Sequence, residues 1–181
     1  MGWVKIESGG GAFSSQMKSV RYPNATTWWY LPYDQLNLDL LPSHDSIGII
    51  LIESEKQAKR RPYHKQKLCY ILSNMRHFAI ETVRKGIPVV YASTNEQYDE
   101  PLRALAQEFG SINMFRAAER ELRLTLSELI EDESIIEHPH PGWLTPQHWF
   151  TETVGNEPPF RMDRFYRSCL LYTSPSPRDR G

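Results

Sequence analysis

A small set of polar residues stands where predicted β-strands end, and their side chains suit the binding of a small molecule. Each segment brings hydrogen-bond donors and acceptors of the kind that hold a polar heterocycle or a ribityl chain. Taken one at a time, such residues are more often turn or helix-cap residues. The candidate cofactor-binding residues are Asp34, Gln35, Leu36, Glu53, Glu119 and Arg120.

A second candidate is a basic run between residues 56 and 67, which also contains Tyr63. Arginine and lysine side chains bind phosphates by charge, and each such contact makes binding depend on salt. The run is equally typical of a solvated loop that leads into a helix. The residues that form the candidate nucleic-acid or phosphate patch are Arg60, Arg61, His64 and Lys67.

The elements that must position these side chains centre on residues 47–91. An apolar run at 47–53 predicts a strand, apolar residues spaced three and four apart between Leu68 and Val83 predict a helix, and 87–91 predicts a second strand. Gly86 is placed to end the helix. Strand, helix and strand form a βαβ unit, so the fold class is α/β: an open, mostly parallel five-stranded Rossmann-like sheet with helices on both faces.

The remaining strands are predicted at 26–31, 112–115 and 134–137, and further helices at 98–109 and 120–131. With the five strands numbered along the chain, we expect the order 3-2-1-4-5. Ligands of such sheets bind beyond the carboxyl ends of the strands, where the strand order reverses. The candidate cofactor-binding residues are then expected to converge there.

Residues outside this domain divide the chain into four parts. Residues 1–25 contain a glycine run and no apolar periodicity, and are expected to be a disordered leader. The α/β domain is expected at 26–137 and a proline-rich irregular segment at 138–167. Residues 168–181 share no pattern with the rest, read as a translated cloning scar, and are left out of the fold.

Several functional classes find no support in the sequence. It has no G-x-G-x-x-G or G-x-x-x-x-G-K-[ST] phosphate loop and no G-x-S-x-G elbow, so no catalytic apparatus is evident. A formal net charge of −1 gives no global attraction to nucleic acid. His138 and His140 lack a third ligand for a metal. Without a signal pattern or an apolar span, a cytoplasmic location is the expectation.

Residues 27–167 resemble the deoxyribodipyrimidine photolyase-related proteins, which are the iron–sulfur bacterial cryptochromes and photolyases. The resemblance rests on the motifs Asp34-Gln35-Leu36-Asn37, Glu53, Arg61-Pro62-Tyr63-His64-Lys65-Gln66-Lys67, Met75-Arg76-His77-Phe78-Ala79, Glu119-Arg120 with Arg123, and Met162-Asp163-Arg164-Phe165-Tyr166-Arg167. The family often has Leu-Gly before the Asp-Gln-Leu, whereas Pro32-Tyr33 stands here. A tyrosine at that point is expected to narrow the pocket.

The resemblance implies an N-terminal antenna domain, which in this family can hold a lumazine-type chromophore. It also implies that FAD and a [4Fe–4S] cluster belong to a C-terminal helical domain beyond residue 167, through which the full-length protein acts on DNA as a lyase. The chain has only Cys69 and Cys169, too few to ligate such a cluster. It therefore reads as a truncated photolyase-like chain that packs against its missing C-terminal domain, with no membrane partner.

Two other interpretations remain open. One is a stand-alone α/β nucleotide-binding or signalling module without light chemistry. The other is a fragment with no function beyond folding and packing against a lost partner domain. It predicts an exposed apolar surface around Trp143, Trp149, Phe150, Phe160 and Phe165.

Overall fold

The computed structural model describes residues 3–5, 12–17, 25–42, 46–143 and 145–173, and divides the chain into two units, residues 1–138 and 139–181. The strands are β1 (Trp3–Lys5), β2 (Thr27–Tyr30), β3 (Ile47–Ser54), β4 (Val89–Thr94), β5 (Ile112–Phe115) and β6 (Ile135–His138). The helices of the first unit are α1 (Ala12–Met17), η1 (Leu38–Leu40), α2 (Glu55–Lys59), α3 (Lys65–Arg84), α4 (Asp99–Phe109), α5 (Arg120–Thr125) and α6 (Ser127–Glu131).

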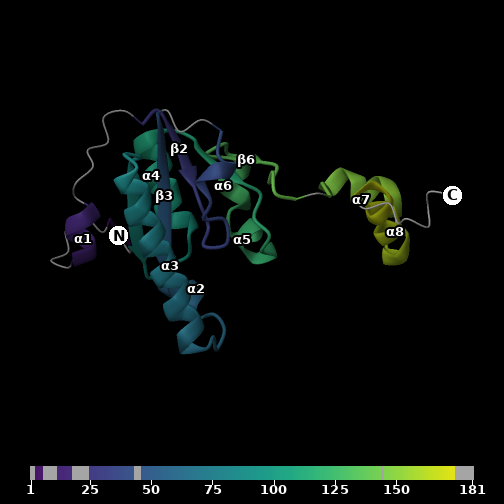
Figure 1. The fold of residues 1–181 in the computed structure, drawn as a ribbon, viewed down its shortest axis with the longest axis horizontal. Coiled ribbons are helices and arrows are strands. Elements are labelled where there is room, and N and C mark those ends of the chain that lie inside the picture. The colour runs from purple at the N-terminus through teal and green to yellow at the C-terminus, as the bar shows by residue number, and fades with distance from the viewer. Residues whose placement is uncertain (1–2, 6–11, 18–24, 43–45, 144, 174–181) are drawn as a thin grey trace. The chain divides into compact units, whose positions relative to one another are not determined.

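The sheet of the first unit has the order β1-β4-β3-β2-β5-β6. Strands β2 to β6 are all parallel, and their order is the predicted 3-2-1-4-5. The α/β class and the five parallel strands predicted from the sequence are therefore confirmed (Figure 1). The order reverses between β2 and β5, so the carboxyl ends of β2, β3 and β5 surround the place where a ligand is expected.

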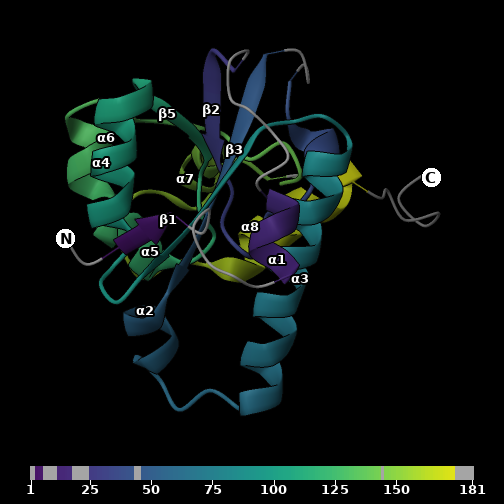
Figure 2. The ribbon, with the colours of Figure 1, turned by 90° about the vertical axis from the view of Figure 1, so that its left-hand side faces the viewer.

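Helices cover both faces of this sheet. On one face, α3 and α1 pack over Trp29, Ile49 and Leu51, and on the other, α4, α5 and α6 pack over Trp28, Ile50 and Val90 (Figure 2). Alternate residues of β2 and β3 thus enter different cores, as the two-residue period of a strand requires. Because both faces are covered, the strands tolerate continuous apolar runs such as the one at 47–52.

The leader was predicted to be disordered over residues 1–25, and this is wrong for two described segments. Strand β1 pairs antiparallel with β4, placing Trp3 opposite Thr94. Helix α1 packs against α3 and buries Met17. Both depend on contacts with distant parts of the chain, which local periodicity does not reveal. Residues 1–2, 6–11 and 18–24 lie outside the described part.

The second unit is also more regular than the irregular segment predicted over 138–167. It contains α7 (Gln147–Val154), which starts directly after Pro146, and α8 (Met162–Thr173). Phe150 of α7 packs edge-on against Phe165 of α8, with ring centroids 5.0 Å apart. Helix α8 continues past residue 168, where the suspected scar was expected to begin; residues 174–181 lie outside the described part.

Tyr30, at the end of β2, offers a test of the core by pH. Its ring is buried, and this burial is the main reason why the pKa of the phenol lies well above its ordinary value. The neighbouring Tyr98 and the charges of Asp34 and Glu119 raise the pKa further. The unfolded chain loses this proton near pH 10 while the folded one keeps it, so the stabilisation from Tyr30 is complete below pH 10 and is lost above it. Wild type should lose about 1.4 kcal/mol more stability than Tyr30→Phe between pH 9 and pH 11, measured by urea unfolding. Equal losses in the two proteins would contradict this.

Candidate functional site

The carboxyl end of β3 leads directly into α2, and one serine fixes the turn between them. The Ser54 hydroxyl oxygen accepts the backbone N–H of Gln57 at 3.0 Å and caps α2. The same hydroxyl donates to the carbonyl of Glu96, after β4, at 2.6 Å. Ser54 therefore holds Glu53 and Gln57 at the strand ends.

Glu53 is the best anchored of the predicted site residues. Its Oε1 accepts from Arg76 Nε at 2.7 Å and from the Tyr91 hydroxyl at 2.5 Å, and its Oε2 accepts from Arg76 Nη2 at 2.9 Å. The Glu53 carboxylate raises the pKa of Arg76. Burial, and then the charge of Glu53, raises the pKa of Tyr91. Both residues therefore stay protonated and donate hydrogen bonds. Oε2 retains a lone pair that no described group uses. Glu53 can therefore accept one more hydrogen bond, from a ligand N–H or O–H.

The facing side of the site comes from the start of α5. Glu119 precedes α5 but does not cap it with its side chain, and its Oε1 instead accepts Gln57 Nε2 at 3.3 Å. Glu121 lies 3.2 Å from Arg60 and 3.1 Å from Arg61, measured from Oε1 to each Nη2. Its own backbone N–H first, and then the nearby arginines, hold the pKa of Glu121 below its ordinary value. These contacts join the α2–α3 segment to α5, about 60 residues further along the chain.

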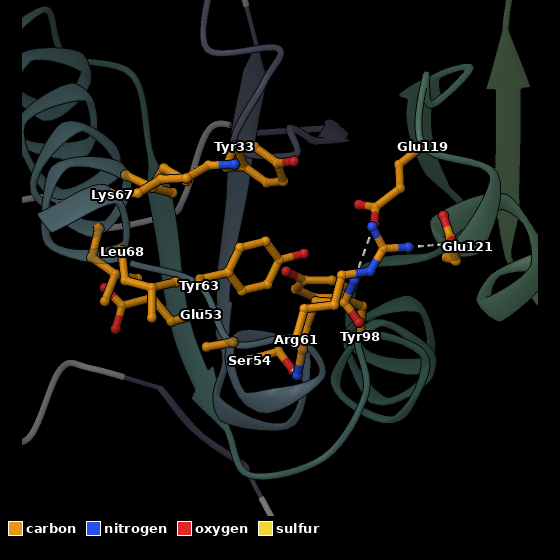
Figure 3. Close-up of a pocket in the computed structure, with 14 residues that line it drawn as sticks. Tyr33, Glu53, Ser54, Arg61, Tyr63, Lys67, Leu68, Tyr98, Glu119 and Glu121 are labelled. Atoms are coloured by element: carbon orange, nitrogen blue, oxygen red, sulfur yellow. Dashed lines mark hydrogen bonds and ion pairs between the residues drawn. The ribbon is translucent and has the colours of Figure 1, made fainter. Parts of the chain in front are cut away.

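Between these two walls lies a pocket of about 320 Å³. Figure 3 shows the rings of Tyr33, Tyr63 and Tyr98 around the hollow, with Glu53 on one side and Glu119 on the other. The apolar part of the lining comes from α3, with Leu68, Ile71 and Leu72 among its residues. The volume falls in the range of small-molecule sites, and the mixture of aromatic surface with a few fixed polar groups is typical of them.

Two of the tyrosines stay neutral over a wide pH range. Burial, and then the negative charge of Glu119, raises the pKa of both Tyr33 and Tyr98. Their hydroxyls therefore remain hydrogen-bond donors, and their rings remain flat surfaces on which a heterocycle could stack. Tyr63 is further held by Lys67, whose Nζ lies 5.2 Å from its ring centroid.

The structure brings some of the predicted site residues together and places others elsewhere. Glu53 and Glu119 line the pocket together with Arg61 and Lys67 from the basic run, and Tyr33 lines it at the loop where a narrowing tyrosine was expected. Asp34 is exposed outside the lining, although its charge reaches Tyr33 and Tyr98. Asn37 has the cap role that its type favours, accepting the backbone N–H of Asp39.

Besides Asp34, three more of the predicted cofactor-binding residues do not line this pocket. Gln35 is buried and donates from Nε2 to the Arg116 carbonyl at 3.1 Å, so it ties β2 to β5. Leu36 packs against the core under α3. Arg120 lines a different groove, on the other side of α5.

The basic run also acts mainly within the protein. Arg60 and Arg61 face Glu121, His64 caps α3 by accepting the N–H of Gln66 at 3.2 Å, and Lys67 lies over Tyr63. The residues that sequence reasoning missed are Ser54, Gln57, Tyr98 and Glu121. For Tyr98, the available signal was its place after β4, because β4 is the parallel neighbour of β3 and ends at the same edge.

Neither a metal centre nor a bilayer span emerges from the described residues. They contain no group of three or more His, Cys, Asp or Glu side chains that could hold a metal ion. Within the same residues, no helix is both long and apolar enough to cross a membrane. Cys69 is exposed on α3, and Cys169 belongs to α8 in the other unit.

Comparison with known families decides the assignment of the chain. The model of the deoxyribodipyrimidine photo-lyase-related protein family matches residues 30–169. The chain belongs to this family. Among curated proteins, none matches it significantly. The photo-lyase-related match covers β3 to β6, every residue lining the 320 Å³ pocket, and most of α8, and it begins at Tyr30, the last residue of β2. The site just described therefore lies within the shared part of the family.

Proposed function

We propose that the α/β unit binds a lumazine-type antenna chromophore in the pocket between α2, α3 and α5. The observation that carries this proposal is the placement of three tyrosine rings and the fixed Glu53 carboxylate around one hollow at the strand-order reversal. A flat heterocycle is expected to stack on a tyrosine ring, which contributes about 0.5–1.5 kcal/mol beyond area burial. The role of the bound chromophore would be to absorb light for a photo-lyase-related flavoprotein.

The donor set of the pocket fits such a group. Glu53 has one acceptor position left, which suits an N–H of the heterocycle. Across the pocket, Glu119 and Gln57 are a carboxylate and an amide within hydrogen-bond reach of one another, which suits the hydroxyls of a ribityl chain. When bound, the chromophore supplies light absorption, and the residues of this chain only orient it and shield it from water.

The partners of the chromophore are part of the same proposal. The family resemblance supports a flavin (FAD), a [4Fe–4S] cluster and DNA as ligands of another domain of a cryptochrome- or photolyase-type protein. We assign no residue of this chain to them. The second unit supports such an arrangement, because α8 exposes Met162, Tyr166 and Leu170, which are spaced four apart and form one face. Weak binding of a hydrophobic dye to this unit would argue against a docking face.

Titration with a ribityl-lumazine tests the chromophore site directly. Wild type should quench the lumazine fluorescence and shift its absorption, and Tyr63→Ala should weaken binding about 10-fold because it removes a stacking ring. Tyr70→Ala is the matched control, since Tyr70 lies on α3 with 74% of its surface exposed and does not line the pocket. Equal affinities for the two variants would contradict the site, and no spectral change with wild type would contradict the function.

The alternative, a nucleotide-binding module, has one observation in its favour. Arg61 and Lys67 line the same pocket and could bind a phosphate. Both are already engaged, with Glu121 and with the Tyr63 ring, which weighs against this alternative. Binding of ATP in preference to the lumazine in the same titration would favour it.

A further inference from the structure

We propose a second ligand site in this unit, which takes the phosphate of a small phosphomonoester. It is a groove of about 340 Å³ beyond the carboxyl ends of β5 and β6, against α5 and α6. Three arginines line it, namely Arg116, Arg120 and Arg123. The groove shares no lining residue with the tyrosine-lined pocket, because Glu119 and Glu121 line that pocket and Arg120 and Arg123 line the groove. The site therefore does not depend on the chromophore.

Two of the three guanidinium groups are held in place by the protein. Arg123 donates from Nη1 to the carbonyls of Ala117 at 2.7 Å and Ala118 at 2.8 Å. Arg116 donates from Nη1 to Glu137 Oε2 at 3.1 Å. The Nε–H and Nη2 groups of Arg123 remain available, in a fork whose orientation is already fixed. A pre-organised fork loses less conformational entropy when it binds an anion than a free side chain does.

Arg120 supplies the third guanidinium, which acts on Glu121 through its charge but forms no direct ion pair with a described carboxylate. Among the described residues, no carboxylate lies within ion-pair distance of it, whereas Arg60, Arg61, Arg76, Arg103 and Arg116 each have one. Planar guanidinium groups match the oxygens of a phosphate two at a time, and charged hydrogen bonds of this kind are the strong ones. Arg120 and Arg123 thus converge on the groove with donors that lack a carboxylate partner.

The charges around the groove favour a small ligand over a nucleic acid. Glu137 neutralises Arg116, and Glu131 adds another negative charge to the lining, which leaves one net positive charge among the five charged residues. A single phosphate can sit between Arg120 and Arg123 and avoid both carboxylates. A polyanionic backbone that crosses the groove would be brought close to them and repelled.

Binding of inorganic phosphate and adenosine monophosphate, followed at low salt by NMR of the arginine Nε–H groups, tests this site. Arg120→Gln should weaken binding of both about 10-fold, as expected for one charged hydrogen-bonded contact. Lys85→Gln removes the same charge from the distant end of α3 and should change the affinity less than about twofold. Glu131→Gln should strengthen binding, because it removes a repulsive charge.

Three outcomes would overturn the proposal. The first is the absence of phosphate binding at millimolar concentration. The second is an equal loss of affinity in Arg120→Gln and Lys85→Gln, which would mean that only net charge matters. The third is tighter binding of a duplex oligonucleotide than of phosphate with the same dependence on Arg120, which would assign the groove to nucleic acid. Tyr63→Ala should leave phosphate binding unchanged, so failure of the chromophore proposal is seen separately.

Discussion

Glu53→Gln is expected to weaken chromophore binding strongly and to destabilise the α/β unit. The glutamine would present an amide N–H₂ where the carboxylate now accepts from Arg76 or Tyr91, and the charge that balances Arg76 would be lost. Hydrogen bonds to charged groups contribute about 1.5–3 kcal/mol, so affinity should fall about 10- to 100-fold. For stability we expect a loss of about 2 kcal/mol, below the value for a fully buried pair, because 46% of the Arg76 side chain is exposed while only 13% of Glu53 is.

The measurements are the lumazine titration and urea unfolding of the unbound protein. Glu55→Gln is the matched control, because Glu55 stands two positions along and, among the described residues, pairs with Lys59 alone, on the surface of α2. It should leave affinity and stability nearly unchanged. A Glu53→Gln protein with wild-type affinity would show that the carboxylate does not face the ligand, even if its stability is reduced.

Gly48→Ala is expected to cost about 3 kcal/mol of stability, at the upper end of overpacking effects. A Cβ at Gly48 would lie 2.5 Å from two carbon atoms of the Trp28 ring, which is the cross-strand neighbour on β2. That ring has nowhere to move, because it is 3% exposed and stacks on Phe109 of α4 with centroids 4.2 Å apart. Urea unfolding of the variant measures the loss.

Gly142→Ala provides the comparison. Its Cβ would meet the ring of His140 at 2.9 Å, but that ring is held by contacts at the surface, from the Gly142 N–H and the exposed Trp143, so it can shift at small cost. The change should stay within about 0.5 kcal/mol. A Gly48→Ala protein as stable as Gly142→Ala would mean that the β2–β3–α4 core is less tightly packed than the contacts with Phe109 indicate.

The sheet could be predicted from the sequence because its signals are local. The apolar run at 47–53, the helical spacing that follows and Gly86 each have a direct physical meaning, and Gly86 has the positive φ of 82° expected at a helix end. The sequence predicts a loop where α2 stands, because the five residues of α2 carry no buried face and the helix is fixed mainly by the Ser54 cap. The helix predicted at 120–131 is divided at Leu126 into α5 and α6.

The site could be predicted only in part, because it depends on side-chain direction. That Glu53 and Glu119 line one pocket follows from the strand order 3-2-1-4-5, which was expected as a common order of doubly wound sheets and not from particular residues. Glu119 and Arg120 are neighbours in sequence, yet Glu119 lines the tyrosine-lined pocket and Arg120 lines the groove on the other side of α5. Which of the two a side chain reaches depends on how the start of α5 is rotated, and this cannot be predicted from the sequence. Gln35 lies outside this pocket, because its buried side chain donates to the Arg116 carbonyl, a contact between two loops that the sequence alone does not reveal.

Helix α1 supports the residues that hold Glu53, so a shorter translation product without this helix would differ from the full chain. Phe13 packs edge-on against Tyr91 with centroids 4.9 Å apart, and Arg76 lies over the Phe13 ring at 5.7 Å, so this helix braces the two residues that hold Glu53. A translation product initiated at Met17 would lack Phe13 and also the antiparallel strand that covers the edge of β4. Such a shorter product would present an open sheet edge to other chains and a less firmly held Glu53 carboxylate to the proposed chromophore.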